Sequence, residues 1–323
     1  MAAISLGVTL HSFSVEYYTY RYTMEDCMAE VGSLGPGTGV ELVGPQMIRG
    51  FPDLPGEFEQ RFTHAVEKYD LRPTAYGGYG DAQRGTGSWA SREEQLDYLK
   101  RQIRAARRLG FPMIRVQPSE VVLTELVSYA EKCDVRMVIE IHAPMAIESI
   151  EQMIRRVETV SSPYLGFAPD SGMFCRTVAD VAVEGFRRRG VPKAILDLVI
   201  QRWQEQTPEA ELVAEVRALG GNDVAQLFAL ESTLHWGHSD PAEMLRIMPY
   251  IHHVHGKFFN ADSEGHDSAV RFGEVISVLR DGGYDGNISF EYDGHLWNPH
   301  DLAIDQIRRM YGTTVKQLES TEN

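Results

Sequence analysis

The sequence has few cysteines and no long hydrophobic run, and both shortages narrow what the protein can be. Its 323 residues include three cysteines, which are scattered and form no CxxC pair. An odd, dispersed set of cysteines suits a reduced cytosolic protein better than a disulfide scaffold. No stretch approaches the length of a transmembrane helix, and the first residues lack the basic and apolar regions of a signal peptide. We therefore expect a soluble, cytoplasmic protein.

Basic residues are also in short supply. Lysine and arginine number 31 against 46 aspartates and glutamates, so the formal net charge is −15. This balance argues against nucleic acid and anionic membrane surfaces as main partners, and solubility is the simplest reason for the acidity. Hydrophobic residues make up 43% of the chain, which is enough for a sizeable core.

Apolar segments of strand length alternate with helical patterns along the whole chain. The eight candidate strands span residues 4–10, 39–43, 73–76, 113–117, 137–142, 164–170, 253–258 and 287–292. Eight strand–helix alternations in a chain of this size predict an α/β fold, a (β/α)8 TIM barrel, as a single domain over residues 1–323. An open doubly wound sheet is the alternative, but no GxGxxG motif follows any strand, which disfavours it.

One stretch departs from the alternation. The chain between the sixth and seventh strands is far longer than one helix requires, and we predict a helical insertion at about residues 176–250. Residues 181–203 contain more apolar side chains than one packed helix face needs, including Ile195, Val199 and Trp203. Because surplus apolar surface usually marks an interface, this segment predicts a contact with a partner subunit.

Polar side chains end four of the candidate strands. Side chains alternate along a strand, so Glu291 shares one face with Ser289 and Asp293. Active sites of TIM barrels lie at the carboxyl ends of the strands. The strand-end residues Glu140, Asp170, His255 and Glu291 therefore predict a divalent-metal site. Three carboxylates with one imidazole suit Mn²⁺, Mg²⁺ or Co²⁺ better than a structural Zn²⁺.

Several of these motifs together resemble the xylose isomerase-like TIM-barrel superfamily of sugar isomerases, epimerases and inosose dehydratases. They are Ile-Glu-Ile-His at 139–142, Pro-Asp-Ser-Gly at 169–172, His-Val-His at 253–255, and Gly-Tyr-Asp-Gly at 283–286 followed by Glu291. The resemblance implies that the same Glu, Asp, His and Glu bind the metal. Within the superfamily, the Glu-Ile-His-Ala-Pro stretch, the insertion and His-Gly-Lys-Phe-Phe are similar to the α subunit of bacterial C-glycoside deglycosidases.

The narrower resemblance implies a small β subunit as partner, a higher oligomer, and a carbohydrate or glycoside substrate. The reaction it implies is Mn²⁺-dependent cleavage of the C–C bond of 3-oxo C-glycosides, in which a proton leaves C2 and the aglycone is eliminated. Such an enzyme is a carbon–carbon lyase. The alternatives are a metal-dependent sugar isomerase or 3-epimerase, and a non-catalytic scaffold subunit.

His142 is the candidate base, because its ordinary pKa suits proton transfer near neutral pH, although it could instead only bind a substrate hydroxyl. Lys257 is the second candidate catalytic residue, as an oxyanion partner or proton donor. The residues expected to bind substrate are His11, Tyr76, Gln117 and His253.

Overall fold

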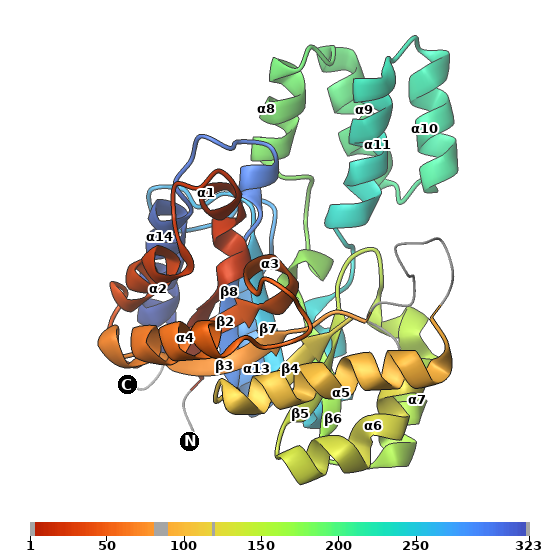
Figure 1. Cartoon of the computed structure of the whole chain (residues 1–323). Helices are drawn as coiled ribbons and strands as arrows, with labels where there is room; N and C mark the ends of the chain where they lie inside the picture. The colour runs from red at the N-terminus through yellow and green to blue at the C-terminus, as the bar shows by residue number, and fades with distance from the viewer. Residues whose placement is uncertain (1–3, 81–89, 118–119, 321–323) are drawn as a thin grey trace.

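Eight parallel strands surrounded by helices form a barrel in the computed structural model, which describes residues 4–80, 90–117 and 120–320 (Figure 1). The strands are β1 (Ser5–Thr9), β2 (Gly39–Val43), β3 (Arg72–Gly77), β4 (Met113–Val116), β5 (Arg136–Ile141), β6 (Leu165–Pro169), β7 (His253–Phe258) and β8 (Asn287–Tyr292). They pair in the order β6-β5-β4-β3-β2-β1-β8-β7. The outer strands β6 and β7 meet through two isolated bridges, Phe167 to Ile251 and Asp170 to His255. The sheet is therefore a nearly closed barrel, which confirms the predicted fold over the open-sheet alternative.

Helices follow the strands in sequence. They are α1 (Ser14–Tyr18), α2 (Met24–Gly32), α3 (Gly44–Met47), α4 (Gly56–Lys68), α5 (Arg92–Arg108), α6 (Glu120–Cys133), α7 (Glu151–Val160), α8 (Asp180–Arg188), α9 (Lys193–Gln204), α10 (Glu209–Ala218), α11 (Asp223–His235), α12 (Met244–Ile247), α13 (Phe272–Asp281) and α14 (Ala303–Glu319). Helix α5 begins with a capping box, in which the Ser91 hydroxyl accepts from the Glu94 N–H and the Glu94 carboxylate accepts from the Ser91 N–H.

The chain between β6 and β7 contains α8 to α12, and α8 to α11 stand together as a group beside the barrel (Figure 1). Aromatic side chains hold this group together, with the rings of Phe186 and Phe228 4.7 Å apart. The Trp203 indole N–H donates to the Trp236 carbonyl at 3.0 Å. Whether this stretch is an insertion relative to simpler barrels stays a prediction.

Most apolar residues of the segment 181–203 are covered. Val191 and, in α9, Ile195, Leu196, Val199 and Trp203 are buried, whereas Leu198 is half-buried. Helix α9 packs against α8, α10 and α11. Residues 181–203 therefore leave less apolar surface free than their composition indicates, and a contact of this segment with a partner subunit stays a prediction.

Charged residues occupy the inside of the barrel near the carboxyl ends of the strands. Glu41 of β2, Glu140 of β5 and His255 of β7 are buried there. Buried charges are costly unless they are paired, so their gathering at one end marks the functional part of the molecule. Within the described residues, no helix combines the length and apolar character needed to cross a membrane.

Candidate metal centre and active-site cavity

The four residues predicted as metal ligands lie together at the carboxyl end of the barrel. Glu140 belongs to β5, Asp170 directly follows β6, His255 belongs to β7 and Glu291 belongs to β8, and one ligand atom of each lies within 4.8 Å of the others. The His255 Nδ1 atom is 2.6 Å from Glu291 Oε2 and 3.0 Å from Glu140 Oε1. Its distance to Asp170 Oδ2 is 3.9 Å. All four side chains are buried.

The ring of His255 is oriented by a residue beneath it. Its Nε2 atom lies 3.1 and 3.0 Å from the two oxygens of Glu41, so Nε2–H donates to that carboxylate. Its Nδ1 atom faces the other three carboxylates, and although Glu291 Oε2 lies 2.6 Å away, none of these contacts has the geometry of a hydrogen bond in the described structure. A metal-ligating histidine commonly has this arrangement, with one nitrogen held by a carboxylate and the other free to bind the ion.

Two permanent cations partly balance the buried carboxylates. Arg115 of β4 contacts Glu41 at 2.8 Å and Glu140 at 2.6 Å. Lys257 of β7 lies 3.0 Å from an oxygen of Asp170 and 3.4 Å from one of Glu291. It also lies 3.2 Å from Asp293, which follows β8.

The centre contains more negative charge than these cations neutralise. Its five carboxylates belong to Glu41, Glu140, Asp170, Glu291 and Asp293. Against Arg115 and Lys257 they leave a net charge of −3 when the histidines are neutral. A buried excess of this size calls for further positive charge. The donor set, the orientation of His255 Nδ1 toward the carboxylates and the charge excess therefore fit a divalent cation.

The pKa values of these groups reflect the same imbalance. Burial raises the pKa of Asp170 to about 6, although Lys257 opposes the rise. Burial alone would raise the pKa of Glu140 as well, but Arg115 and His255 lower it to about 2. Burial would lower the pKa of His255, whereas Glu41 and Glu291 raise it well above its ordinary value. When no metal is bound, the His255 ring is thus the place where a proton supplies the missing charge.

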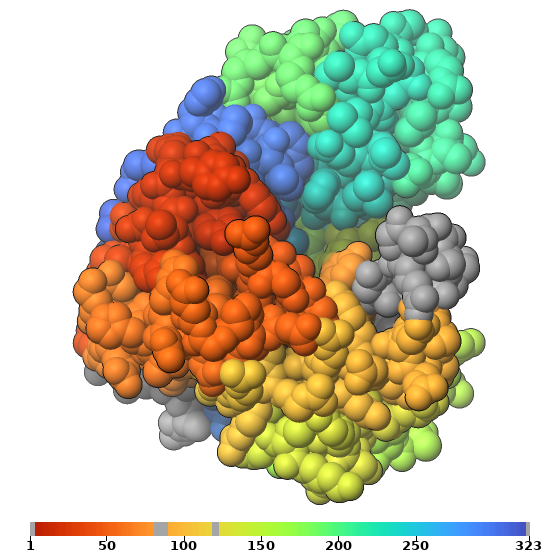
Figure 2. Space-filling model, in the orientation of Figure 1, coloured from red at the N-terminus to blue at the C-terminus, as the bar shows by residue number. Residues whose placement is uncertain are grey.

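A cavity of about 510 Å³ lies above the centre. Its polar wall contains groups of the centre itself, namely Arg115, Glu140, Asp170, Lys257 and Glu291. Its other wall includes Tyr79, Leu234 and Leu296, which are 46%, 38% and 51% exposed. Figure 2 shows the surface hollowed between the N-terminal segment and the helices around α11. The cavity therefore has a charged floor, formed by the groups of the centre, and an apolar rim, formed by Tyr79, Leu234 and Leu296.

The other residues predicted from the sequence fall into two groups. His142, His11 and Gln117 line the cavity. The His142 Nδ1–H donates to the Ala143 carbonyl at 2.6 Å, which leaves Nε2 to carry the lone pair. Tyr76 and His253 are fully buried and are not among the lining residues. His253 Nε2 instead lies 3.0 Å from Glu41, so this histidine supports the centre from inside the barrel.

Sequence reasoning did not identify Glu41 and Arg115. Each is a charged residue inside an otherwise apolar strand, Gly-Val-Glu-Leu-Val in β2 and Met-Ile-Arg-Val in β4. Charged residues at such positions are rarely buried without a partner, so their presence in these strands was the sequence feature that could have indicated a role in the site. The partner of each, however, lies on a different strand and is fixed only by closure of the barrel.

Comparison with known proteins agrees with the architecture. Residues 29–178 match the family described as xylose isomerase-like TIM barrel. The 3'-dehydrocarminate deglycosidase alpha subunit of a Microbacterium species is 33% identical over 97% of this chain and 97% of its own length. A C-glycoside deglycosidase alpha subunit of Arthrobacter globiformis is 33% identical over 94% of this chain and 87% of its own. A crystal structure of IOLI protein with a binding zinc atom superposes with a TM-score of 0.61 at 13% identity, covering 98% of this chain and 99% of that one.

These similarities define the class of protein. The chain belongs to the xylose isomerase-like TIM-barrel family. Within that family, relatives that match it over nearly its whole length carry the name deglycosidase alpha subunit.

Proposed function

We propose that this protein is the catalytic α subunit of a lyase that cleaves the C–C bond of 3-oxo C-glycosides with the help of a divalent metal. The observation that carries the proposal is the cavity, where a cation-binding cluster, a histidine and an apolar rim meet. A sugar can lie on the charged floor while a flat aglycone packs against Tyr79, Leu234 and Leu296. The names of the full-length relatives support the same reaction.

Glu140, Asp170, His255 and Glu291 would hold the metal. Three carboxylates and one imidazole favour Mn²⁺, with Mg²⁺ and Co²⁺ as further choices. When bound, the ion supplies Lewis-acid stabilisation of negative charge that develops on the sugar oxygens. Glu41 fixes the ring of His255, so that its Nδ1 atom already points toward the other three ligands before an ion takes the place of the proton.

His142 is the proposed base. The ketone at C3 acidifies the hydrogen on C2, and His142 Nε2 takes that proton from a sugar bound in the cavity. The electrons of the C2–H bond form a C1–C2 double bond as the bond from C1 to the aglycone carbon breaks. The aglycone carbon then takes a proton, so the products are a protonated aglycone and an unsaturated 3-oxo sugar. No oxidant or reductant is required.

Lys257 is the proposed partner of the developing oxyanion. Its ammonium group lies beside Asp170, Glu291 and Asp293 and lines the cavity. Burial would lower the pKa of Lys257, but these carboxylates raise it well above the ordinary value, Asp170 having the largest effect. The group therefore stays charged and acts by stabilising negative charge on the substrate, not by releasing a proton early.

A sugar 3-epimerase or isomerase is the second candidate. It is favoured by the two carboxylates, Glu140 and Glu291, that flank the centre at 3.0 and 2.6 Å from the same nitrogen of His255. Such a pair could remove and return a proton on opposite faces of a sugar. The apolar rim and the cavity-lining His142 favour the lyase, because a free ketose needs neither.

A partner subunit forms part of the proposal. The full-length relatives are named alpha subunits, so we propose that a small β subunit joins this chain in a higher oligomer and helps to close the cavity. Scattering or sedimentation of the chain, alone and with the product of a neighbouring gene, tests this point. A fully active monomer would refute it.

The test of the function compares two substrates. The chain, with its partner and Mn²⁺, is incubated with a 3-oxo C-glucoside of an aromatic aglycone and separately with free ketoses. Chromatography should detect released aglycone from the first and no change in the second. Epimerisation of ketoses without release of aglycone from the glucoside would replace the lyase with the second candidate.

A further inference from the structure

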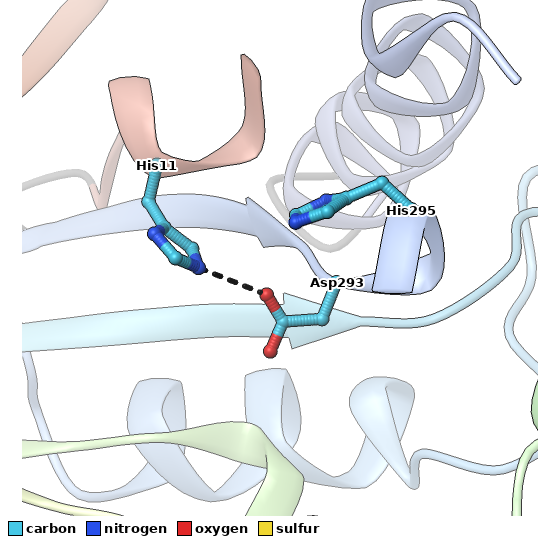
Figure 3. Close-up of side chains that lie close together, drawn as sticks. All are labelled: His11, Asp293 and His295. Carbon is cyan, nitrogen blue, oxygen red and sulfur yellow. Dashed lines mark ion pairs between the residues drawn. The ribbon is translucent and has the colours of Figure 1, made fainter. Parts of the chain in front are cut away.

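A second set of metal-ligand atoms lies at the edge of the cavity, outside the cluster described above. It consists of His11 in the 3-10 helix η1 (Leu10–Phe13), Asp293 directly after β8, and His295 in η6 (Gly294–Leu296). One ligand atom of each lies within 4.8 Å of the other two. Figure 3 shows the side chains of His11, Asp293 and His295 close together, with a dashed line for the ion pair between His11 and Asp293.

His295 presents a lone pair to this group. Its Nδ1–H donates to the Tyr292 carbonyl at 2.9 Å, which fixes the tautomer and leaves Nε2 unprotonated. The side chain is buried, with 5% of the residue exposed. A histidine held at one nitrogen by a backbone carbonyl and free at the other is oriented as metal ligands commonly are.

Asp293 supplies an unpartnered oxygen. Its Oδ2 atom contacts Lys257 at 3.2 Å, whereas its buried Oδ1 atom has no hydrogen-bond partner in the described structure. The distance from Oδ1 to His11 Nε2 is 3.4 Å, which is long for a hydrogen bond between a ring nitrogen and a carboxylate. Two ligands on a tetrahedral ion with bonds of about 2.0–2.2 Å lie about 3.4 Å apart, so the spacing suits a shared ion better.

We propose that His11, Asp293 and His295 form a second divalent-cation site, which selects a borderline transition ion such as Zn²⁺ or Co²⁺. Two imidazoles and one carboxylate favour these ions, whereas the first cluster is richer in oxygen. The first ion would reduce the charge of −3 at the centre to −1, so the region would still attract a cation.

Glu291 lies between the two sites. Its Oε2 atom is 2.6 Å from His255 in the first site, and its Oε1 atom is 4.0 Å from His11 Nε2 in the second. His11 and Asp293 both line the cavity, so an ion held by them meets whatever the cavity binds. The second ion would be a further Lewis acid for the hydroxyl or carbonyl oxygens of a bound ligand. The inference depends only on these side chains and not on the proposed reaction.

The test counts metal ions. Protein stripped with a chelator is titrated with Co²⁺, and binding is followed by calorimetry and by the visible absorption of the ion. Five proteins are compared: the wild type, His295→Gln, His11→Gln, Asp170→Asn and His235→Gln. His235 lines the same cavity but lies outside the second set, so its variant is the matched control.

The wild type and His235→Gln should bind one more equivalent of Co²⁺ than His295→Gln and His11→Gln do. An Asp170→Asn variant should lose the other equivalent, which separates the two sites. Equal Co²⁺ stoichiometry in the wild type, His295→Gln and His11→Gln would overturn the proposal. In that case an ion pair between a protonated His11 and Asp293 would describe these side chains better. If His295→Gln fails to fold by circular dichroism, the partly exposed His11 still decides the outcome.

Discussion

At the scale of single residues, the centre depends on groups that orient one another. His255 is held by Glu41 at one nitrogen and faces three carboxylates with the other. We expect His255→Ala and Asp170→Ala to reduce the bound divalent metal sharply while the barrel stays folded, because the apolar core does not depend on the ion. Metal analysis together with circular dichroism checks this. Full metal occupancy in both variants would show that the ligands are assigned wrongly.

His142 should separate binding from catalysis. His142→Gln keeps approximate size but cannot accept a proton, so the turnover rate should fall by about 10²–10⁴. The metal content should not change, since His142 is outside the group of four ligand atoms. Turnover of a 3-oxo C-glycoside and metal analysis are measured on the same preparation. A variant with wild-type turnover would reduce His142 to a residue that only lines the cavity.

The sequence indicates some of these residues better than others. Glu140 and Glu291 can be found from the strand period, because alternation places them on the inner face at the ends of apolar strands. Glu41 and Arg115 are at similar positions, but their role depends on His255 and Glu140, which come from other strands. Local patterns do not contain such contacts, so closure of the barrel has to be known first.

At the scale of elements, the seam between β6 and β7 is where the barrel is least continuous. Gly166 of β6 faces His252 and the Tyr250 carbonyl so closely that an added Cβ would collide with both. Gly166→Ala should therefore lower the free energy of unfolding by about 1–3 kcal/mol, as overpacking does. Denaturant unfolding measures the change. Gly312→Ala in α14 is the control, since nothing lies near its added Cβ, and it should be neutral or slightly stabilising.

Element boundaries follow closely from the sequence where turns and polar residues delimit them. The predicted strands at 39–43, 253–258 and 287–292 coincide with β2, β7 and β8. The apolar residues of α9 predict that the helix is buried, but its sequence does not show how many neighbouring helices bury it. Ile195 and Val199 are covered within the group of α8 to α11, so they offer no free interface.

At the scale of the whole molecule, acid should destabilise the protein partly through His252. Burial lowers the pKa of this histidine to about 4, with a further contribution from Arg136. The unfolded chain, with an ordinary histidine pKa of about 6.5, binds the proton first as the pH falls. The free energy of unfolding therefore decreases as the pH falls from about 6.5 to 4. At pH 5 we expect His252 to have lowered it by about 1–2 kcal/mol.

Denaturant unfolding at pH 7 and pH 5 checks this contribution. His252→Gln has no group to protonate, so it should lose less stability over this interval than the wild type does. The exposed His64 of α4 is the matched control, and His64→Gln should follow the wild type. Identical losses in His252→Gln and the wild type would show that His252 has no part in the acid sensitivity.

The central claim is that the cavity at the end of this barrel breaks a C–C bond with the help of a divalent metal. The most direct measurement follows a 3-oxo C-glycoside in deuterated water by NMR, with the chelator-treated protein before and after Mn²⁺ is restored and with the partner subunit present. We predict that free aglycone accumulates only after Mn²⁺ is added. Deuterium that enters the intact sugar while no aglycone is released would contradict the claim, because it would show proton transfer without cleavage of the bond.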